Sequence, residues 1–191
     1  MKHTINLPNT LTALRILGTV CLLFFPTKSL WFILIYTLAG LTDVLDGYIA
    51  RKTGQSTEFG AKLDSAADLI YYTVMLLRIF PVLWERLHRQ IWLLVGLVLA
   101  VRLSAYVVAA VKYRRFASQH TWLNKATGLM IFAVPYVINT PIGAGFCWII
   151  GIVGFLASGE ELVLHLVSKQ YNTKTKSILP LLRDAKRAKE V

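Results

Sequence analysis

Long apolar runs separated by short polar segments make up most of the 191-residue chain. Several runs approach the roughly 20 residues that a helix needs to cross about 30 Å of hydrocarbon. A helix satisfies its backbone hydrogen bonds internally, as lipid requires. The pattern therefore predicts an all-α, polytopic membrane protein with six transmembrane helices. The predicted spans are residues 10–26, 29–52, 59–80, 90–112, 122–139 and 143–168.

The polar segments at the two ends predict an interfacial lead-in and a tail. In the lead-in, Lys2 to Asn9, Pro8 suits the first turn of a helix, and Asn9 or Thr10 suits its N-cap. The last segment is rich in Lys and Arg. We therefore divide the chain into a six-helix membrane domain, residues 1–168, and a basic tail, residues 169–191.

Composition supports a membrane protein, since 55% of the residues are hydrophobic, 16% are charged and the mean hydropathy is +0.55. The net charge of +11 favours a basic rim beside anionic lipid headgroups over nucleic-acid binding. Most Lys and Arg residues fall on the side of both termini and the 52–58 turn. This bias predicts that the termini lie in the cytoplasm of a bacterial-type cell. Cys21 and Cys147 fall inside spans and indicate neither a disulfide nor a metal site.

Aspartates interrupt the second and third spans, in LTDVLDGYIARKTGQSTEFGAKLDSAADLIYY, residues 41–72. In an antiparallel hairpin turning near Gln55, Asp43 lies at the depth of Asp68, and Asp46 at that of Asp64. The spacings of three and four residues place each pair on one helix face. We therefore expect four carboxylates to converge on one site that opens to the cytoplasm.

Four carboxylates at membrane depth need compensating positive charge. Each costs about 2.5 to 3.5 kcal/mol near the centre of a span, and like charges repel. Arg51, Lys52 and Lys62 are close in sequence. Oxygen ligands, however, suit hard divalent cations, and two such ions balance four carboxylates. The sequence therefore predicts a site for two Mg²⁺ or Mn²⁺ ions.

The carboxylates belong to a longer motif that resembles the signature of the CDP-alcohol phosphatidyltransferase family. It reads Asp43-x2-Asp46-Gly47-x2-Ala50-Arg51-x8-Gly60-x3-Asp64-x3-Asp68. The resemblance implies a homodimeric membrane enzyme that transfers a phosphatidyl group from CDP-diacylglycerol to a small alcohol and releases CMP. It also implies that Asp43, Asp46 and Asp64 hold the metals, while Asp68 shares a metal and acts as general base.

The same resemblance implies a set of contacts to the CDP part of the donor. Gly47, Ala50, Arg51 and Gly60 fill the family's positions for these contacts. Thr57 resembles a position near the nucleotide phosphates, although it also suits a plain helix cap. The lead-in that contains Asn9 resembles a segment that encloses the nucleotide. The full set is Asn9, Gly47, Ala50, Arg51, Thr57 and Gly60.

The acceptor alcohol is indicated by two stretches that differ in their resemblance. The opening NLPNTLTALRIL resembles phosphatidylglycerophosphate synthases, which implies glycerol 3-phosphate. The stretch LDSAADL, with Ser65 and Leu69, is closer to phosphatidylserine synthases. Glycerol 3-phosphate is therefore the first expectation, and L-serine or an inositol phosphate are the alternatives.

Two basic residues are candidates to bind a phosphate of the acceptor. Arg102 lies in the middle of the fourth span, and Lys125 lies near the start of the fifth. The alternative for Arg102 is an ion pair with Glu160 or Glu161 on the sixth span. The alternative for Lys125 is an ammonium group that reaches the membrane surface.

Two other classes of function are compatible with acidic residues in a membrane. A cation channel or transporter would spread its acids over several spans or a repeated half. A non-catalytic scaffold with the same fold would have lost an aspartate or Gly47. The chain instead concentrates its acids in one hairpin and keeps every motif position. These features favour the enzyme.

Overall fold

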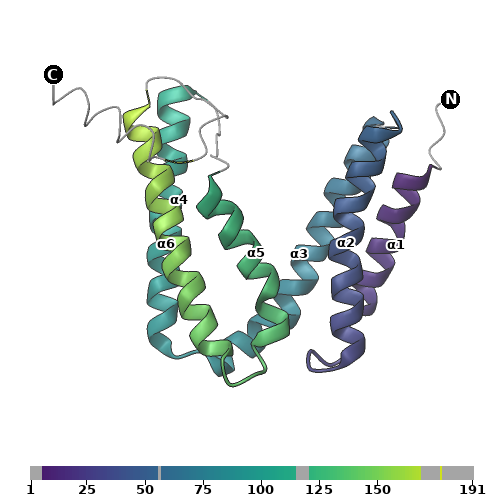
Figure 1. Ribbon diagram of the computed structural model, residues 1–191, viewed down its shortest axis with the longest axis horizontal. Coiled ribbons are helices and arrows are strands. Elements are labelled where there is room, and N and C mark those ends of the chain that lie inside the picture. Colours follow the sequence, from purple (N-terminus) through teal and green to yellow (C-terminus); the bar gives the residue numbers. More distant parts are fainter. Residues whose placement is uncertain (1–5, 56, 115–120, 169–176, 178–191) are drawn as a thin grey trace. The chain divides into compact units, whose positions relative to one another are not determined.

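The computed structural model describes residues 6–55, 57–114, 121–168 and 177. Within these ranges the chain forms six helices and no strand, which confirms the all-α prediction (Figure 1). One helix overlaps each predicted span, although the first begins before its span and the third ends beyond its span. The helices are α1 (Leu7–Cys21), α2 (Leu30–Lys52), α3 (Glu58–Arg86), α4 (Arg89–Tyr113), α5 (Trp122–Val137) and α6 (Gly143–Val167).

Four helices, α2, α3, α4 and α6, are long and apolar enough to cross a membrane. With 15 and 16 residues, α1 and α5 are shorter. Large apolar side chains are exposed on all six helices, for example Leu93 and Leu129 at more than 70% exposure. Such outward-facing apolar surface suits lipid, and the chain is an integral membrane protein.

The chain divides into two compact units, residues 1–85 and 86–191. The first holds α1, α2 and almost all of α3, and the second holds α4, α5 and α6. Of the predicted basic tail, residues 169–191, only Ser177 is within the described residues, and its hydroxyl donates to Oε1 of Glu160 at 3.0 Å.

Helix α1 begins at Leu7 because Asn6 provides its N-cap. The side-chain oxygen of Asn6 accepts the backbone N–H of Asn9 at 2.9 Å, and Pro8 lies in the first turn as predicted. The prediction that Asn9 or Thr10 is the cap is therefore wrong. Asn9 lies one turn further into the helix instead, where it is buried.

In the first unit, α1 packs along α2, and side chains connect both helices to α3. The rings of Tyr36 on α2 and Tyr71 on α3 are stacked with centroids 5.9 Å apart. At the other end, Arg78 of α3 donates to the carbonyl of Phe25 at 2.5 Å. The hydroxyl oxygen of Ser29 accepts the backbone N–H of Phe32 and so caps α2. The side chain of Phe32 is fully buried. Polar and aromatic contacts thus hold the third helix of this unit.

In the second unit, α6 packs against both α4 and α5 through small residues. A Cβ on Gly151 would lie 2.5 Å from Cδ2 of Leu94, so glycine permits the close approach of α6 to α4. Ala105 and Ala109 of α4 and Ala157 of α6 are fully buried. Small side chains therefore set the helix separation in this unit.

A polar cluster lies inside the second unit. Arg102 of α4 donates to Oε2 of Glu161 on α6 at 2.5 Å and to Oδ1 of Asn124 on α5 at 2.9 Å. Asn124 donates in turn to the same oxygen of Glu161 at 3.0 Å. Glu161 is fully buried. Of the two partners considered for Arg102, the structure pairs it with Glu161, and this cluster joins all three helices.

Replacing Arg102 tests the importance of this cluster. Arg102→Met leaves the carboxylate of Glu161 buried without its main cation, which should cost about 3 kcal/mol of stability. The measurement is the thermal unfolding midpoint of the protein in detergent. Glu58→Gln is the control, because it breaks a pair with Lys62 in which both side chains are largely exposed. An equal effect of the two substitutions would show that the buried cluster adds nothing.

Candidate functional site

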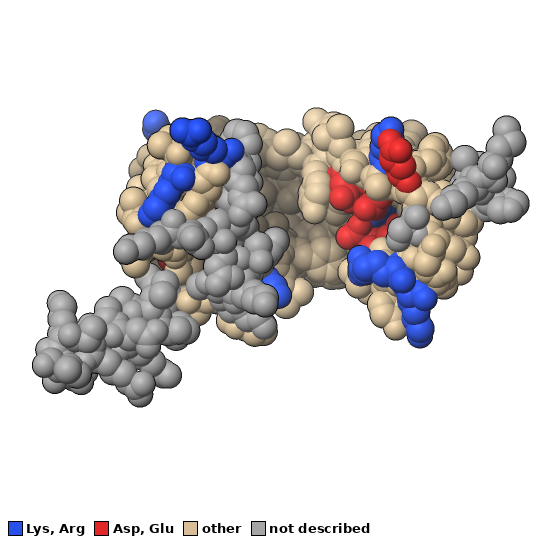
Figure 2. Space-filling view, turned by 90° about the horizontal axis from the view of Figure 1, so that it is seen from above, with Lys and Arg blue, Asp and Glu red and all other residues tan. Residues whose placement is uncertain are grey.

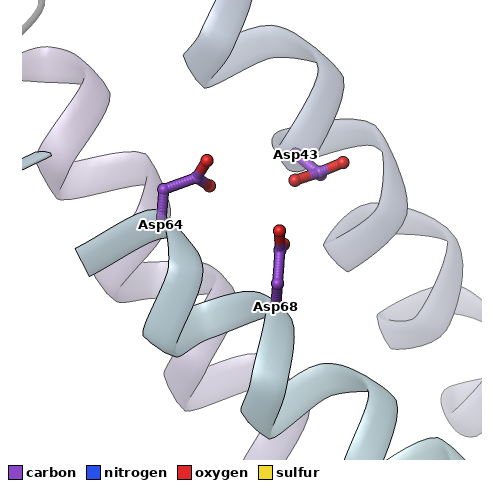
Figure 3. Close-up of side chains that lie close together, drawn as sticks. All are labelled: Asp43, Asp64 and Asp68. Atoms are coloured by element: carbon purple, nitrogen blue, oxygen red, sulfur yellow. The ribbon is translucent and has the colours of Figure 1, made fainter. Parts of the chain in front are cut away.

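Three of the four predicted carboxylates form a cluster between α2 and α3. Asp43 of α2 and Asp64 and Asp68 of α3 point toward one another (Figure 3). One carboxylate oxygen from each lies within 4.8 Å of the other two. Their side chains are 50%, 47% and 44% exposed, so an ion can reach them from solvent. The hairpin register inferred from the sequence thus brings Asp43 to Asp68, with Asp64 beside them.

A buried arginine of α1 lies among these carboxylates. The side chain of Arg15 is 2% exposed, and its guanidinium pairs with Asp43 and Asp64. It also lies 3.3 Å from Asp68 and 3.7 Å from Asp46. All four aspartates of the motif are therefore within ion-pair distance of one cation, which joins α1, α2 and α3.

Asp46 lies apart from the other three carboxylates. It is 4% exposed, and its Oδ2 accepts the hydroxyl of Thr12 on α1 at 2.7 Å. Thr12 and Arg15 are three residues apart and so share one face of α1. Of the four carboxylates that were predicted to converge, three thus form a half-exposed group. The fourth, Asp46, is buried beside them and is held by α1.

A pocket of about 240 Å³ opens next to the carboxylates. Two of the motif's acids, Asp46 and Asp64, line it. So do all six residues that the sequence associated with the CDP part, namely Asn9, Gly47, Ala50, Arg51, Thr57 and Gly60. Figure 2 shows acidic and basic side chains gathered at the end of the molecule where α2 ends and α3 begins. The structure therefore brings these positions together.

Gly60 permits the close approach of α1 and α3 at the pocket. A Cβ there would lie 2.7 Å from Oδ1 of Asn9 and 3.1 Å from Oγ1 of Thr57. Thr57 accepts the N–H of Gly60 at 3.0 Å and so caps α3, as one interpretation of the sequence held. It also lines the pocket, so the two interpretations of Thr57 are compatible.

The two acceptor-phosphate candidates both lie in the second unit. Arg102 uses both terminal nitrogens for Glu161 and Asn124. The ammonium of Lys125 lies 5.4 Å from the ring centroid of Trp122, a cation–π contact at the start of α5. Lys125 thus has its charge near the helix end.

The sequence interpretation missed Arg15 and Thr12. Among the cations it considered instead, Lys62 pairs with Glu58 at 2.7 Å and Lys52 lies over the ring of Tyr48. A signal was present, because Arg15 is an isolated charge in an apolar run, as the aspartates are. The same cost argument that singled out the acids applies to a guanidinium in a span.

The three clustered carboxylates fit a hard divalent cation. Oxygen ligands of Mg²⁺ lie about 2.0 to 2.1 Å from the ion, so neighbouring ligands are about 3 Å apart. A small closing of oxygens that lie within 4.8 Å of one another reaches this spacing. The guanidinium of Arg15 binds the same three side chains and would compete with such an ion for them.

Comparison with known proteins shows similarity along most of the chain. The family model for CDP-alcohol phosphatidyltransferase matches residues 5–157. A CDP-diacylglycerol–glycerol-3-phosphate 3-phosphatidyltransferase of Pseudomonas fluorescens is 30% identical over 81% of this chain and 83% of its own length. A protein of the same description from Haemophilus influenzae is 43% identical over 39% of this chain and 43% of its own length. A cardiolipin synthase (CMP-forming) of Streptomyces coelicolor is 29% identical over 85% of this chain and 79% of its own length. No solved structure matches the chain.

The hydrogen bond from Thr12 to Asp46 can be removed without a change of size. Thr12→Val removes the hydroxyl donor of a buried carboxylate and should lower the stability by about 1 to 3 kcal/mol. Thr42→Val is the matched control, because the Thr42 hydroxyl donates only to carbonyls of its own helix among the contacts of the described residues. The readout is the unfolding midpoint of each variant in detergent. Equal midpoints for the two variants would contradict a role of Thr12 in holding Asp46.

Proposed function

The chain belongs to the CDP-alcohol phosphatidyltransferase family, as its motif predicted, and we propose that it transfers the phosphatidyl group of CDP-diacylglycerol to glycerol 3-phosphate with release of CMP. The observation that carries this proposal is the pocket in which four motif residues lie with Asn9 and Thr57 beside Asp46 and Asp64. A nucleotide bound there has its diphosphate next to the clustered carboxylates. The relatives are described as synthases and transferases, which favours an enzyme over a channel or a scaffold.

The carboxylates would hold two divalent cations, Mg²⁺ or Mn²⁺. Asp43, Asp64 and Asp68 supply the half-exposed oxygens, and Asp46 supplies a further carboxylate on the pocket side. When bound, such cations neutralise charge on the diphosphate and on the leaving CMP. The support for this part of the proposal is the donor set itself, because closely spaced carboxylate oxygens are the ligands that these ions prefer.

Asp68 is proposed as the general base. Its carboxylate is 44% exposed and lies in the cluster with Asp43 and Asp64, so a hydroxyl from solvent can reach it. It would accept the proton of the acceptor alcohol while the oxygen attacks phosphorus. The residues that line the pocket bind and orient the donor: Arg51 offers a guanidinium, and Gly47 and Gly60 leave room for the donor beside the backbone.

Glycerol 3-phosphate is the preferred acceptor because relatives described by that reaction match this chain. The similarity to a cardiolipin synthase makes a lipid alcohol, phosphatidylglycerol, the second candidate. L-Serine and an inositol phosphate remain alternatives from the sequence. Lys125 is the better candidate for the acceptor phosphate, because Arg102 already binds Glu161 and Asn124.

We further propose that all six helices cross the membrane. Apolar residues 22–25 follow α1, and Ile138 follows α5, which lengthens both apolar stretches. The excess of Lys and Arg beside the α2–α3 turn supports a cytoplasmic side for the pocket and both termini. The donor's acyl chains can then stay in the bilayer.

As in the family generally, we propose a homodimer.

A membrane assay with CDP-diacylglycerol and Mg²⁺ or Mn²⁺ tests the reaction. Each acceptor is supplied in turn: glycerol 3-phosphate, phosphatidylglycerol, L-serine and inositol phosphate. We expect CMP release to be fastest with glycerol 3-phosphate. Asp68→Asn should slow it by about 10² to 10⁴-fold, whereas Glu58→Gln, an exposed acid of the same helix, should not. The reaction assignment is wrong if no acceptor elicits CMP, and the role of Asp68 is wrong if its variant is as fast as the parent.

Filling the space at Gly60 tests the nucleotide pocket. In Gly60→Ala the new methyl group displaces Asn9, so we expect KM for CDP-diacylglycerol to rise about tenfold or more while the protein stays folded. Gly128→Ala is the control, because a Cβ there meets no atom within 4 Å. The readouts are initial rates over a range of donor concentration and the unfolding midpoint. An unchanged KM in a folded Gly60→Ala variant would remove Asn9 and Gly60 from the donor site.

A further inference from the structure

Arg15 is bound by the same carboxylates that are proposed to hold the metals. We propose that Arg15 is an internal counter-ion: its guanidinium holds the aspartates together in the metal-free protein, and cations load by displacing it from Asp43, Asp64 and Asp68. This inference rests on the proposed metal site and adds a step that regulates its occupancy. It concerns α1, which carries no residue of the carboxylate motif.

The positions of the guanidinium nitrogens support this role. Nη1 pairs with Oδ1 of Asp43 and lies 3.3 Å from Oδ1 of Asp68, while Nη2 pairs with Oδ1 of Asp64. Each of the three carboxylates thus gives one oxygen to Arg15. These side chains are also the ones whose oxygens lie within 4.8 Å of one another. The guanidinium therefore binds the same three carboxylates that a cation would use.

The charge of the cluster gives the direction of the effect. Four carboxylates and one guanidinium leave a formal excess of three negative charges, so the metal-free site is still under repulsion. A guanidinium does not lose its proton in a protein, so its positive charge is permanent. A divalent ion a few ångströms away is repelled by it strongly in this poorly solvated position. Arg15 should therefore stabilise the empty site and weaken metal binding.

The burial of Arg15 keeps its guanidinium close to the carboxylates even after a cation displaces it from them. Its side chain is 2% exposed and its Nε is buried. The backbone oxygen of Arg15 accepts the hydroxyl of Thr19 at 2.7 Å one turn further along α1. Asp46, whose Oδ2 lies 3.7 Å from Nη2, borders the pocket beside it.

The experiment compares metal binding and stability in Arg15→Met and Arg15→Lys with the parent. Each full-length protein is purified in detergent and stripped with a chelator. Mn²⁺ binding is then followed by electron paramagnetic resonance, and unfolding is measured in chelator and in saturating Mn²⁺. Arg102→Met is the matched control, because it removes another arginine that pairs with a buried carboxylate, away from the carboxylate motif.

We expect Arg15→Met to bind Mn²⁺ about tenfold or more tightly than the parent. In chelator its unfolding midpoint should fall by about 10 °C, and saturating Mn²⁺ should restore most of that loss. Arg15→Lys keeps the positive charge but loses the two nitrogens of the guanidinium. Its Mn²⁺ affinity and its unfolding midpoint in chelator should therefore lie between those of the parent and those of Arg15→Met. Arg102→Met should be destabilised equally with and without Mn²⁺, and its Mn²⁺ affinity should match the parent's.

Each remaining outcome overturns the inference. Weaker or unchanged Mn²⁺ binding in Arg15→Met, or a loss of stability that Mn²⁺ does not restore, makes Arg15 a plain structural residue. If Arg15→Met folds in neither condition, Arg15→Lys decides by the same criteria. A parent protein that binds no Mn²⁺ overturns the proposed metal site as well, whereas a parent that binds Mn²⁺ with the affinity of Arg15→Met overturns only the role of Arg15.

Discussion

A charge inside a helix that faces lipid has to find an opposite charge within the protein, and this constraint organises both units. In the first unit Arg15 lies among four aspartates, and in the second Arg102 joins Glu161 and Asn124. Removing one partner of such a group leaves an uncompensated buried charge, which costs several kcal/mol. Each arginine connects three helices. The ion pairs therefore determine which helix faces meet, while the apolar surfaces turn outward.

The site depends on the contrast between tight and loose packing around α3. Gly60 lets the start of this helix approach Asn9 closely, so α1 closes one side of the pocket. Further along, α3 is joined to its neighbours by side chains: the ion pairs of Arg15, the stacked rings of Tyr36 and Tyr71, and the bond from Arg78 to Phe25. Between these points the carboxylates of α3 stay half exposed. A site for a charged substrate needs both properties, a defined wall and access from water.

Periodicity and the cost of buried charge predicted much of this arrangement. The apolar runs located all six helices, and the hairpin register brought Asp43, Asp64 and Asp68 together because depth along two antiparallel helices follows from residue number. The start of α1 was misplaced because Asn6, Asn9 and Thr10 all suit a cap, and only the fold selects Asn6. Arg15 was missed because its position depends on how α1 rotates against the hairpin, which no local pattern specifies. The two acceptor candidates, Arg102 and Lys125, lie in the second unit, and the motif has no residue there.

The shared guanidinium also has a consequence for how this sequence can change. Five side chains on three helices form one electrostatic unit, so the effect of replacing any of them depends on which of the others are present. Replacing one charged residue of the group by a neutral one changes its net charge. Replacing a residue of the opposite charge by a neutral one then restores part of the original net charge. Such sites accept paired changes more readily than single ones. Drift at these five positions is therefore expected to be concerted, and a lone substitution in a relative points to a compensating partner nearby.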